Sequence, residues 1–307
     1  MSHRSRSKHQ HWVPQFYLRY FATPDSRNSK TPKVWIIWKD HEDGDEQLTS
    51  VRNVCGKRYL YSPLQRDGER DWSVDERLND IEGLLGQVWP KLATDYVDLS
   101  DEHIRKALSL FVSVTHMRHP DIRARVEQIH ASLVDFFGSG LMHADGTPMI
   151  DSVVVAGESR PFDTSRWQEF KNQGKDGHDR EFVQMIQSDV GLMAERLLEK
   201  RWSILLSDHD TYVTSDKPVV LSPPSRDRYG YGTKGVIITF PISTSRLLVL
   251  DDLYNEPANQ YYRLEPTSAG AVNMTIWRNS TRFLITGRPV PEVRREINSL
   301  ANAHGNA

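Results

Sequence analysis

The sequence contains a single cysteine in 307 residues, which excludes a disulfide framework and any zinc module built from several cysteines. It lacks an apolar run near the ~18 residues needed to span a bilayer, and its first residues lack the apolar core of a secretory signal. It also lacks a Gly-rich phosphate loop, a Gly-x-Ser-x-Gly elbow and a His-Glu-x-x-His motif. We therefore expect a cytoplasmic protein without a membrane segment, outside those enzyme classes.

Net charge is also nearly absent, because 39 Lys and Arg oppose 41 Asp and Glu and leave −2. Bulk charge therefore does not predict nucleic-acid binding. The distribution is uneven, since residues 1–39 hold eight basic residues and one acid, Asp25, which gives +7 there and −9 in the remainder. The basic residues are Arg4, Arg6, Lys8, Arg19, Arg27, Lys30, Lys33 and Lys39. Such a segment either contacts nucleic acid or is an ordinary solvated terminus.

Local patterns predict an α+β protein. In the N-terminal unit we expect a short helix at 14–22, a strand at 34–39, a turn at 43–46 and a segment at 58–63 that closes the unit. In the middle we expect helices at 73–96, from 100 to about 119, from 121 and at 180–200, with an irregular insertion at 138–180 that contains a strand at 152–156. In the last third we expect strands at 202–207, 211–216, 235–242, 246–252 and 282–287, and helices at 267–278 and from 291.

This order of strands, helices and strands favours one compact, two-lobed α+β protein over alternating βαβ units. Its expected parts are an N-terminal strand-helix unit with a basic arm (1–64), a helical region (65–200) and a β-rich region (201–307).

The segment His11–Phe21 combines polar and aromatic side chains. If its helix begins at Pro14, Gln15 and Arg19 lie one turn apart on the same face, and His11 lies just before the first turn. These three groups could bind an anion or orient a phosphate. In the alternative, aromatic residues bury the helix while Gln15 and Arg19 stay in water. His9 and His11 also have the spacing of two metal ligands on a strand, although spacing identifies no third ligand.

Glu82 lies within the apolar stripe of the helix expected at 73–96. A carboxylate in that position must be paired, bind a metal or have a raised pKa. Arg118, near the end of the next predicted helix, is the candidate partner. A purely structural Glu82–Arg118 ion pair is the alternative to a functional site.

Asp216 follows a short predicted strand within Thr214–Pro218, so the sequence places a carboxylate in a loop. A turn that only joins two strands is the alternative. Cys55 fits a small buried apolar residue better than a nucleophile.

On these motifs the chain resembles an uncharacterised family of bacterial and phage proteins known only as a domain of unknown function. Members open with His-x-x-Pro-Gln-x-Tyr-Leu-Arg-x-Phe, which residues 11–21 match. The further similar features are Cys55 followed by Tyr59 or Tyr61, Glu82, Arg118, Thr214–Pro218 and Pro241–Ser243, over about residues 9–290. Gly56 departs from the family, where an acidic residue is common. The resemblance implies which residues form the site but does not imply a reaction. Because members occur in bacterial and phage genomes, it also implies a role in defence or genome conflict.

Six polar residues carry the functional prediction: His11, Gln15, Arg19, Glu82, Arg118 and Asp216. One imidazole, two carboxylates and two guanidiniums favour metal-assisted phosphodiester hydrolysis, most of all a nuclease. We expect His11, Glu82 and Asp216 to be catalytic and to bind Mg²⁺ or Mn²⁺. We expect Gln15, Arg19 and Arg118 to bind the substrate, with residues 1–39 helping to hold nucleic acid. The alternative is a non-enzymatic ligand-binding, nucleic-acid-binding or sensor protein in which these side chains form a buried network.

Overall fold

The computed structural model describes residues 6–40, 45–155, 157–225, 229–265 and 268–304. The N-terminal elements are β1 (His9–His11), α1 (Gln15–Leu18), the 3-10 helix η1 (Arg19–Phe21), β2 (Lys33–Trp38), β3 (Gln47–Ser50), the 3-10 helix η2 (Val51–Asn53) and β4 (Gly56–Arg58). The middle elements are α2 (Ser73–Thr94), α3 (Glu102–Met117), α4 (Pro120–Gly138), β5 (Ser152–Val155), β6 (Glu158–Pro161), α5 (Trp167–Lys171) and α6 (Lys175–Leu198). The last elements are β7 (Arg201–Leu206), β8 (Thr214–Ser215), β9 (Val220–Ser222), β10 (Ile237–Ser243), β11 (Arg246–Asp251), β12 (Gln260–Arg263), α7 (Ala269–Asn279), β13 (Phe283–Thr286) and α8 (Val290–His304).

The α+β class is confirmed, with a strand-helix start, a helical middle and a strand-rich end. The segment at 58–63 is extended only as far as Arg58, because Tyr59 has a φ of 54° that ends the extended backbone. The turn expected at 43–46 and the basic residue Arg4 fall at least partly outside the described residues.

Two larger sheets form the body. One has five strands in the order β12-β7-β11-β10-β9, and the other has four in the order β3-β2-β13-β8. In the second sheet β2 pairs antiparallel with β13, so that Ile36 lies opposite Ile285. This pairing joins the predicted N-terminal unit to the β-rich region at the end of the chain.

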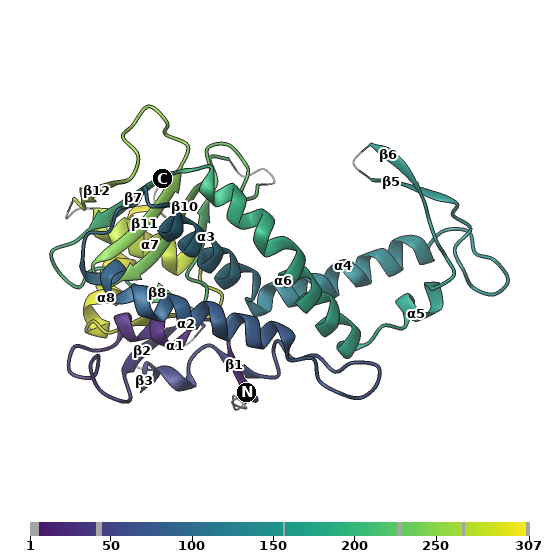
Figure 1. The fold of residues 1–307 in the computed structure, drawn as a ribbon, viewed down its shortest axis with the longest axis horizontal. Helices are drawn as coiled ribbons and strands as arrows, with labels where there is room; N and C mark the ends of the chain where they lie inside the picture. Colours follow the sequence, from purple (N-terminus) through teal and green to yellow (C-terminus); the bar gives the residue numbers. More distant parts are fainter. Residues whose placement is uncertain (1–5, 41–44, 156, 226–228, 266–267, 305–307) are drawn as a thin grey trace.

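A projecting arm is the most distinctive feature of the overall shape. Figure 1 shows α2, α3 and part of α6 beside the sheets, whereas α4, the β5–β6 hairpin and α5 extend away from the body. The predicted insertion at 138–180 therefore contains regular structure, namely an antiparallel hairpin and a short helix.

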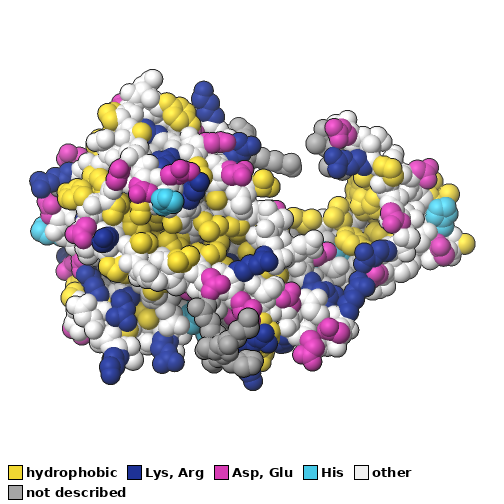
Figure 2. All heavy atoms as spheres, viewed as in Figure 1, with side chains coloured by type: hydrophobic (Ala, Val, Ile, Leu, Met, Phe, Trp, Pro, Cys, Tyr) yellow, Lys and Arg dark blue, Asp and Glu magenta, His cyan; other side chains and the backbone are white. Residues whose placement is uncertain are grey.

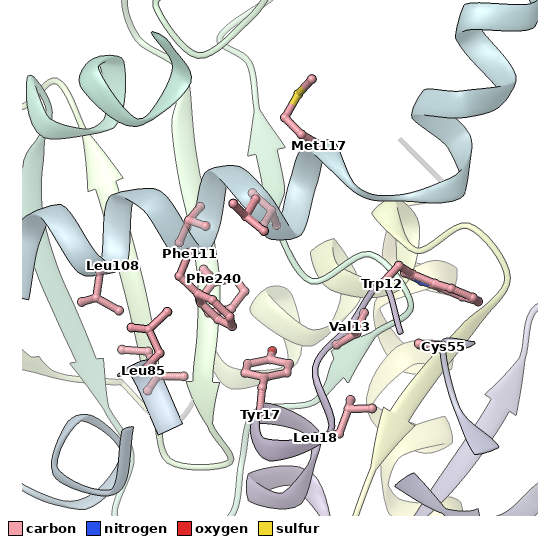
Figure 3. Packing of buried hydrophobic residues seen from close by; sticks show 14 of the residues in the cluster. Trp12, Val13, Tyr17, Leu18, Cys55, Leu85, Leu108, Phe111, Met117 and Phe240 are labelled. Atoms are coloured by element: carbon pink, nitrogen blue, oxygen red, sulfur yellow. The ribbon is translucent and has the colours of Figure 1, made fainter. Parts of the chain in front are cut away.

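The main core fixes the N-terminal helix between the long helices and the five-stranded sheet. The Tyr17 ring stacks on Phe240 with centroids 5.2 Å apart, and Figure 3 shows both beside Phe111. Trp89 meets Phe111 edge to face at 4.9 Å. Full burial of each such side chain contributes about 1.5–3 kcal/mol, so α1 is held by packing rather than by its own four residues.

Within the described residues, no helix is long and apolar enough to cross a membrane.

Candidate functional site

A two-stranded ribbon positions the histidines. β1 pairs antiparallel with β4, with His9 opposite Arg58 and His11 opposite Gly56. Alternation along the strand places both imidazoles on one face, where their centroids lie 4.9 Å apart. A Cβ at position 56 would overlap the His9 ring, so any other residue there would require this exposed imidazole to shift.

Gln10 points to the opposite face of β1 and is buried. Its Nε2 donates to Ser62 Oγ at 2.6 Å, and its Oε1 accepts from the Tyr61 backbone N–H at 2.7 Å. Both ends of the amide are therefore used, and the ribbon is fixed to the segment that precedes α2.

His11 is held in one tautomer. Its Nε2 lies 3.0 Å from the Arg52 carbonyl oxygen, and because a carbonyl only accepts, Nε2 carries the proton. Its Nδ1 is then the acceptor that faces the Gln15 amide at 3.4 Å. Burial lowers the pKa of His11 below its ordinary value. At neutral pH the ring is uncharged and presents a basic nitrogen.

Arg118 is a fully buried cation at the C-cap of α3. Its Nε donates to the Trp12 carbonyl at 2.7 Å, and its Nη1 donates to Glu82 Oε1 at 2.6 Å. The Glu82 side chain on α2 keeps 26% exposure, so the pair is open to solvent on one side only. The predicted Glu82–Arg118 pairing is confirmed.

The second terminal nitrogen of Arg118 is the notable atom. Nη2 is buried and finds no hydrogen-bond acceptor among the described residues. A buried donor left unpaired costs about 1–3 kcal/mol, more for a charged group. Because Arg118 lines a pocket, an acceptor that enters the pocket comes close to the guanidinium that carries this unpaired donor.

That pocket has a volume of about 220 Å³. It is lined by Ser7, His9, Gln10, His11, Gln15, Phe16, Tyr61, Asp75, Leu78, Asn79, Glu82 and Arg118. A second hollow of about 480 Å³ shares Ser7, His9, His11 and Gln15 and adds Thr31, Ser50, Arg52 and Asn53. Four of the six predicted residues therefore converge, namely His11, Gln15, Glu82 and Arg118.

The sequence prediction missed two polar residues of α2. Asp75 lies two turns and Asn79 one turn before Glu82 on the same face, and Asn79 Nδ2 lies 3.4 Å from Asp75 Oδ2. Burial raises the pKa of Asp75, and the charge of Glu82 adds to that rise. The i, i+4, i+7 spacing of these three polar residues was the available signal.

Asp216 does not join this pocket, and its predicted place beside His11 and Glu82 is wrong. Its two carboxylate oxygens accept the backbone N–H groups of Thr281 at 3.0 Å and Arg282 at 2.8 Å. Burial raises its pKa to about 6. Its backbone oxygen accepts the Trp12 indole N–H at 2.9 Å, so Asp216 ties the approach to β13 to the N-terminal segment.

Arg19 also lies outside the pocket. Its Nη1 donates to the carbonyls of Arg27 and Ser29, both at 3.3 Å. It therefore holds the loop before β2, and this position does not support the substrate-binding role predicted for it.

The predicted metal set of His11, Glu82 and Asp216 is not assembled, because Asp216 is engaged elsewhere. Across the described ranges, no group of three or more His, Cys, Asp or Glu side chains is placed to hold a metal ion. Cys55 is buried, and burial raises the pKa of its thiol well above the ordinary range, which leaves it in the unreactive protonated form.

The basic residues of segment 1–39 do not form one strip. Arg27 pairs with Asp210, and Lys39 donates to backbone carbonyls. Exposed cations close to the histidines include Arg52 of η2 and Arg58 of β4. Figure 2 shows Lys and Arg side chains over the part of the body where β2 and β3 lie in Figure 1.

Comparison with known proteins gives a family without a function. A family described as "Protein of unknown function (DUF4238)" matches residues 9–289. No curated protein and no solved structure matches the chain.

Proposed function

The chain belongs to this family of unknown function, DUF4238. From its site we propose that the His11–Arg118 pocket hydrolyses phosphodiester bonds in nucleic acid. One observation carries the proposal. A neutral imidazole and a buried guanidinium with an unpaired donor, brought by β1 and α3, line the same 220 Å³ pocket. A base for the attacking water and a fixed donor for the developing negative charge are the two groups that such a reaction needs.

His11 is the proposed general base. The Arg52 carbonyl fixes its tautomer and orientation, as an oriented partner does in other catalytic histidines. Its Nδ1 faces the Gln15 amide at 3.4 Å, a long and therefore weak hydrogen bond that a water molecule can replace. The lowered pKa keeps this nitrogen unprotonated at neutral pH.

Arg118 is the proposed phosphate contact, through Nη2, while Glu82 fixes the guanidinium through Nη1. A guanidinium already desolvated and held by two other bonds needs no reorganisation when charge develops on the substrate. Glu82 is then a positioning residue for Arg118.

Charge balance supports a divalent ion as cofactor. The pocket lining holds the carboxylates of Asp75 and Glu82 against one guanidinium, so a phosphodiester would add to a negative excess. Mg²⁺ commonly binds through one or two carboxylates together with water and substrate phosphate, without a full protein cage. We propose that Mg²⁺ or Mn²⁺ enters with the substrate at Asp75 or Glu82.

The exposed cations Arg52 and Arg58 beside the histidines suit a polyanionic substrate that crosses the ribbon. We propose a cytoplasmic nuclease that acts in bacterial defence or in conflict between phage and host genomes.

The test is incubation of the protein with single- and double-stranded DNA and RNA, with Mg²⁺, Mn²⁺ or EDTA. We expect cleavage that requires a divalent ion and is lost in His11→Ala and Glu82→Gln. The matched controls are His209→Ala and Glu195→Gln, whose side chains are exposed away from the pocket. Cleavage that survives His11→Ala would contradict the proposal.

A second candidate function is binding without turnover. It is favoured by the engagement of both His11 nitrogens, which gives a closed hydrogen-bond network instead of a free base. In that case the same variants would weaken nucleic-acid binding, and no product would form.

A further inference from the structure

The arm contains a cavity separate from the His11–Arg118 pocket. It lies between α4, the segment after β6, α5 and the start of α6, and its volume is about 410 Å³. It is lined by Leu133, Phe137, Phe162, Asp163, Arg166, Trp167, Glu169, Phe170, Gln173 and Glu181. Figure 2 shows hydrophobic side chains gathered on this arm.

Aromatic rings dominate the lining. Phe137 stacks on Phe162 with centroids 4.6 Å apart, and Trp167 lies 6.0 Å from Phe170. Phe137 and Trp167 meet edge to face at 6.3 Å, so the four rings form one continuous wall. The faces of such rings carry negative electrostatic potential and attract cations.

The charged residues around the cavity are mainly acidic. Arg166 forms an ion pair with Glu169, and Glu169 also forms an ion pair with Arg66. Asp163 and Glu181 remain, and in the described part of the chain neither forms an ion pair with a Lys, Arg or His side chain. The lining residues therefore carry a net charge of −2, and the pairing of Arg66 with Glu169 leaves −1 beside the aromatic wall.

Two donors in the lining are unpaired. Trp167 is only 3% exposed, yet its indole N–H has no acceptor among the described residues. The Gln173 Nε2 is also buried without a partner. A ligand that carries an oxygen acceptor would remove this cost of about 1–3 kcal/mol per donor.

From these three features we propose that the arm cavity binds a small organic cation of the alkylated ammonium class that also carries an oxygen acceptor. The ammonium would lie against the aromatic wall near Asp163 and Glu181, and the oxygen would accept from Trp167 or Gln173. A neutral apolar compound would satisfy the rings but neither the carboxylates nor the donors.

The experiment is titration of the full chain with choline, acetylcholine and 3,3-dimethylbutan-1-ol, monitored by calorimetry and ligand-observed NMR. The last compound has the shape of choline without its charge. We expect at least one cation to bind, and the neutral isostere to bind at least about threefold more weakly.

Three variants locate the site. Trp167→Phe keeps an aromatic ring and removes the N–H, and Glu181→Gln removes one acidic charge at equal size. Each should weaken cation binding at least about threefold, while Glu195→Gln on the exposed face of the same helix should not. Thermal unfolding of each variant establishes that it is folded.

Three results would overturn the proposal. They are equal binding of choline and its neutral isostere, binding unchanged in both Trp167→Phe and Glu181→Gln, and no binding of either cation up to about 10 mM.

Discussion

Arg118 Nη1 lies 2.6 Å from Glu82 Oε1, and this ion pair joins the end of α3 to the middle of α2 in the lining of the His11–Arg118 pocket. The guanidinium is buried, whereas the carboxylate is partly open to solvent. The pair thus holds one charge out of water and leaves Nη2 without an acceptor among the described residues. Stability and function are therefore expected to depend on the same two residues.

Removal of Glu82 should destabilise the protein. We predict that Glu82→Gln lowers the free energy of unfolding by about 1.5–3 kcal/mol, because a buried charge loses its charged partner. Glu195→Gln, at an exposed position, should change it by no more than about 0.5 kcal/mol. Urea denaturation measures both. Equal stability of the two variants would show that the ion pair contributes nothing.

Gly56→Ala should disturb the pocket more than the fold. The new Cβ would overlap the imidazole of His9, which can move because it is the end of an exposed side chain. We expect a stability change within about 1 kcal/mol and a clear loss of cleavage. Gly83→Ala is the matched control, since nothing lies within 4 Å of a Cβ there. Full activity of Gly56→Ala would show that His9 need not remain against β4.

Asp216 should affect stability in a pH-dependent way. Burial raises its pKa to about 6, so the folded protein takes up a proton between pH 7 and pH 5 that the unfolded chain takes up only near pH 4. Acidification from pH 7 to pH 5 should therefore stabilise the wild type, relative to Asp216→Asn, by about 1 kcal/mol.

The same variant should also be less stable at pH 7 by about 1–3 kcal/mol. An asparagine has one oxygen, and Asp216 accepts the N–H groups of both Thr281 and Arg282. Urea denaturation at pH 5, 6 and 7 measures both effects. A difference between wild type and variant that does not grow on acidification would contradict the raised pKa.

The pH dependence of cleavage should report His11. A general base acts when neutral, and burial lowers the pKa of His11 below 6.5. We predict that kcat/KM for bis(p-nitrophenyl) phosphate rises with pH, with an apparent pKa below 6.5, and is level between about pH 7 and 8. An apparent pKa above 6.5, or a pH dependence that persists in His11→Ala, would assign the base to another group.

Much of this pocket could be predicted from local sequence patterns. His11 lies just before the helix that carries Gln15, and Glu82 interrupts an apolar stripe, so each position is unusual without any knowledge of the fold. Arg118 followed from the need of a buried carboxylate for a partner, and the structure confirms that pair. The useful signal was a polar residue at a position where the local pattern predicts an apolar one.

The remainder depends on contacts between distant segments. Asp216 and Arg19 are polar residues of the same kinds, but their partners are backbone groups that the sequence does not identify. Likewise β2 pairs with β13 from the far end of the chain, and no local pattern specifies that register. Asp75 was missed because an acidic residue in the first turn of a helix is ordinary.

The most direct test is single-turnover cleavage of a fluorescent oligonucleotide by the wild type, His11→Ala and His209→Ala, each with Mn²⁺ or Mg²⁺. If the pocket is a phosphodiesterase centre, the rate should fall about 10²–10⁴-fold in His11→Ala and stay near the wild-type rate in His209→Ala. Equal rates in all three proteins, or no cleavage of any DNA or RNA substrate by the wild type, would contradict the assignment.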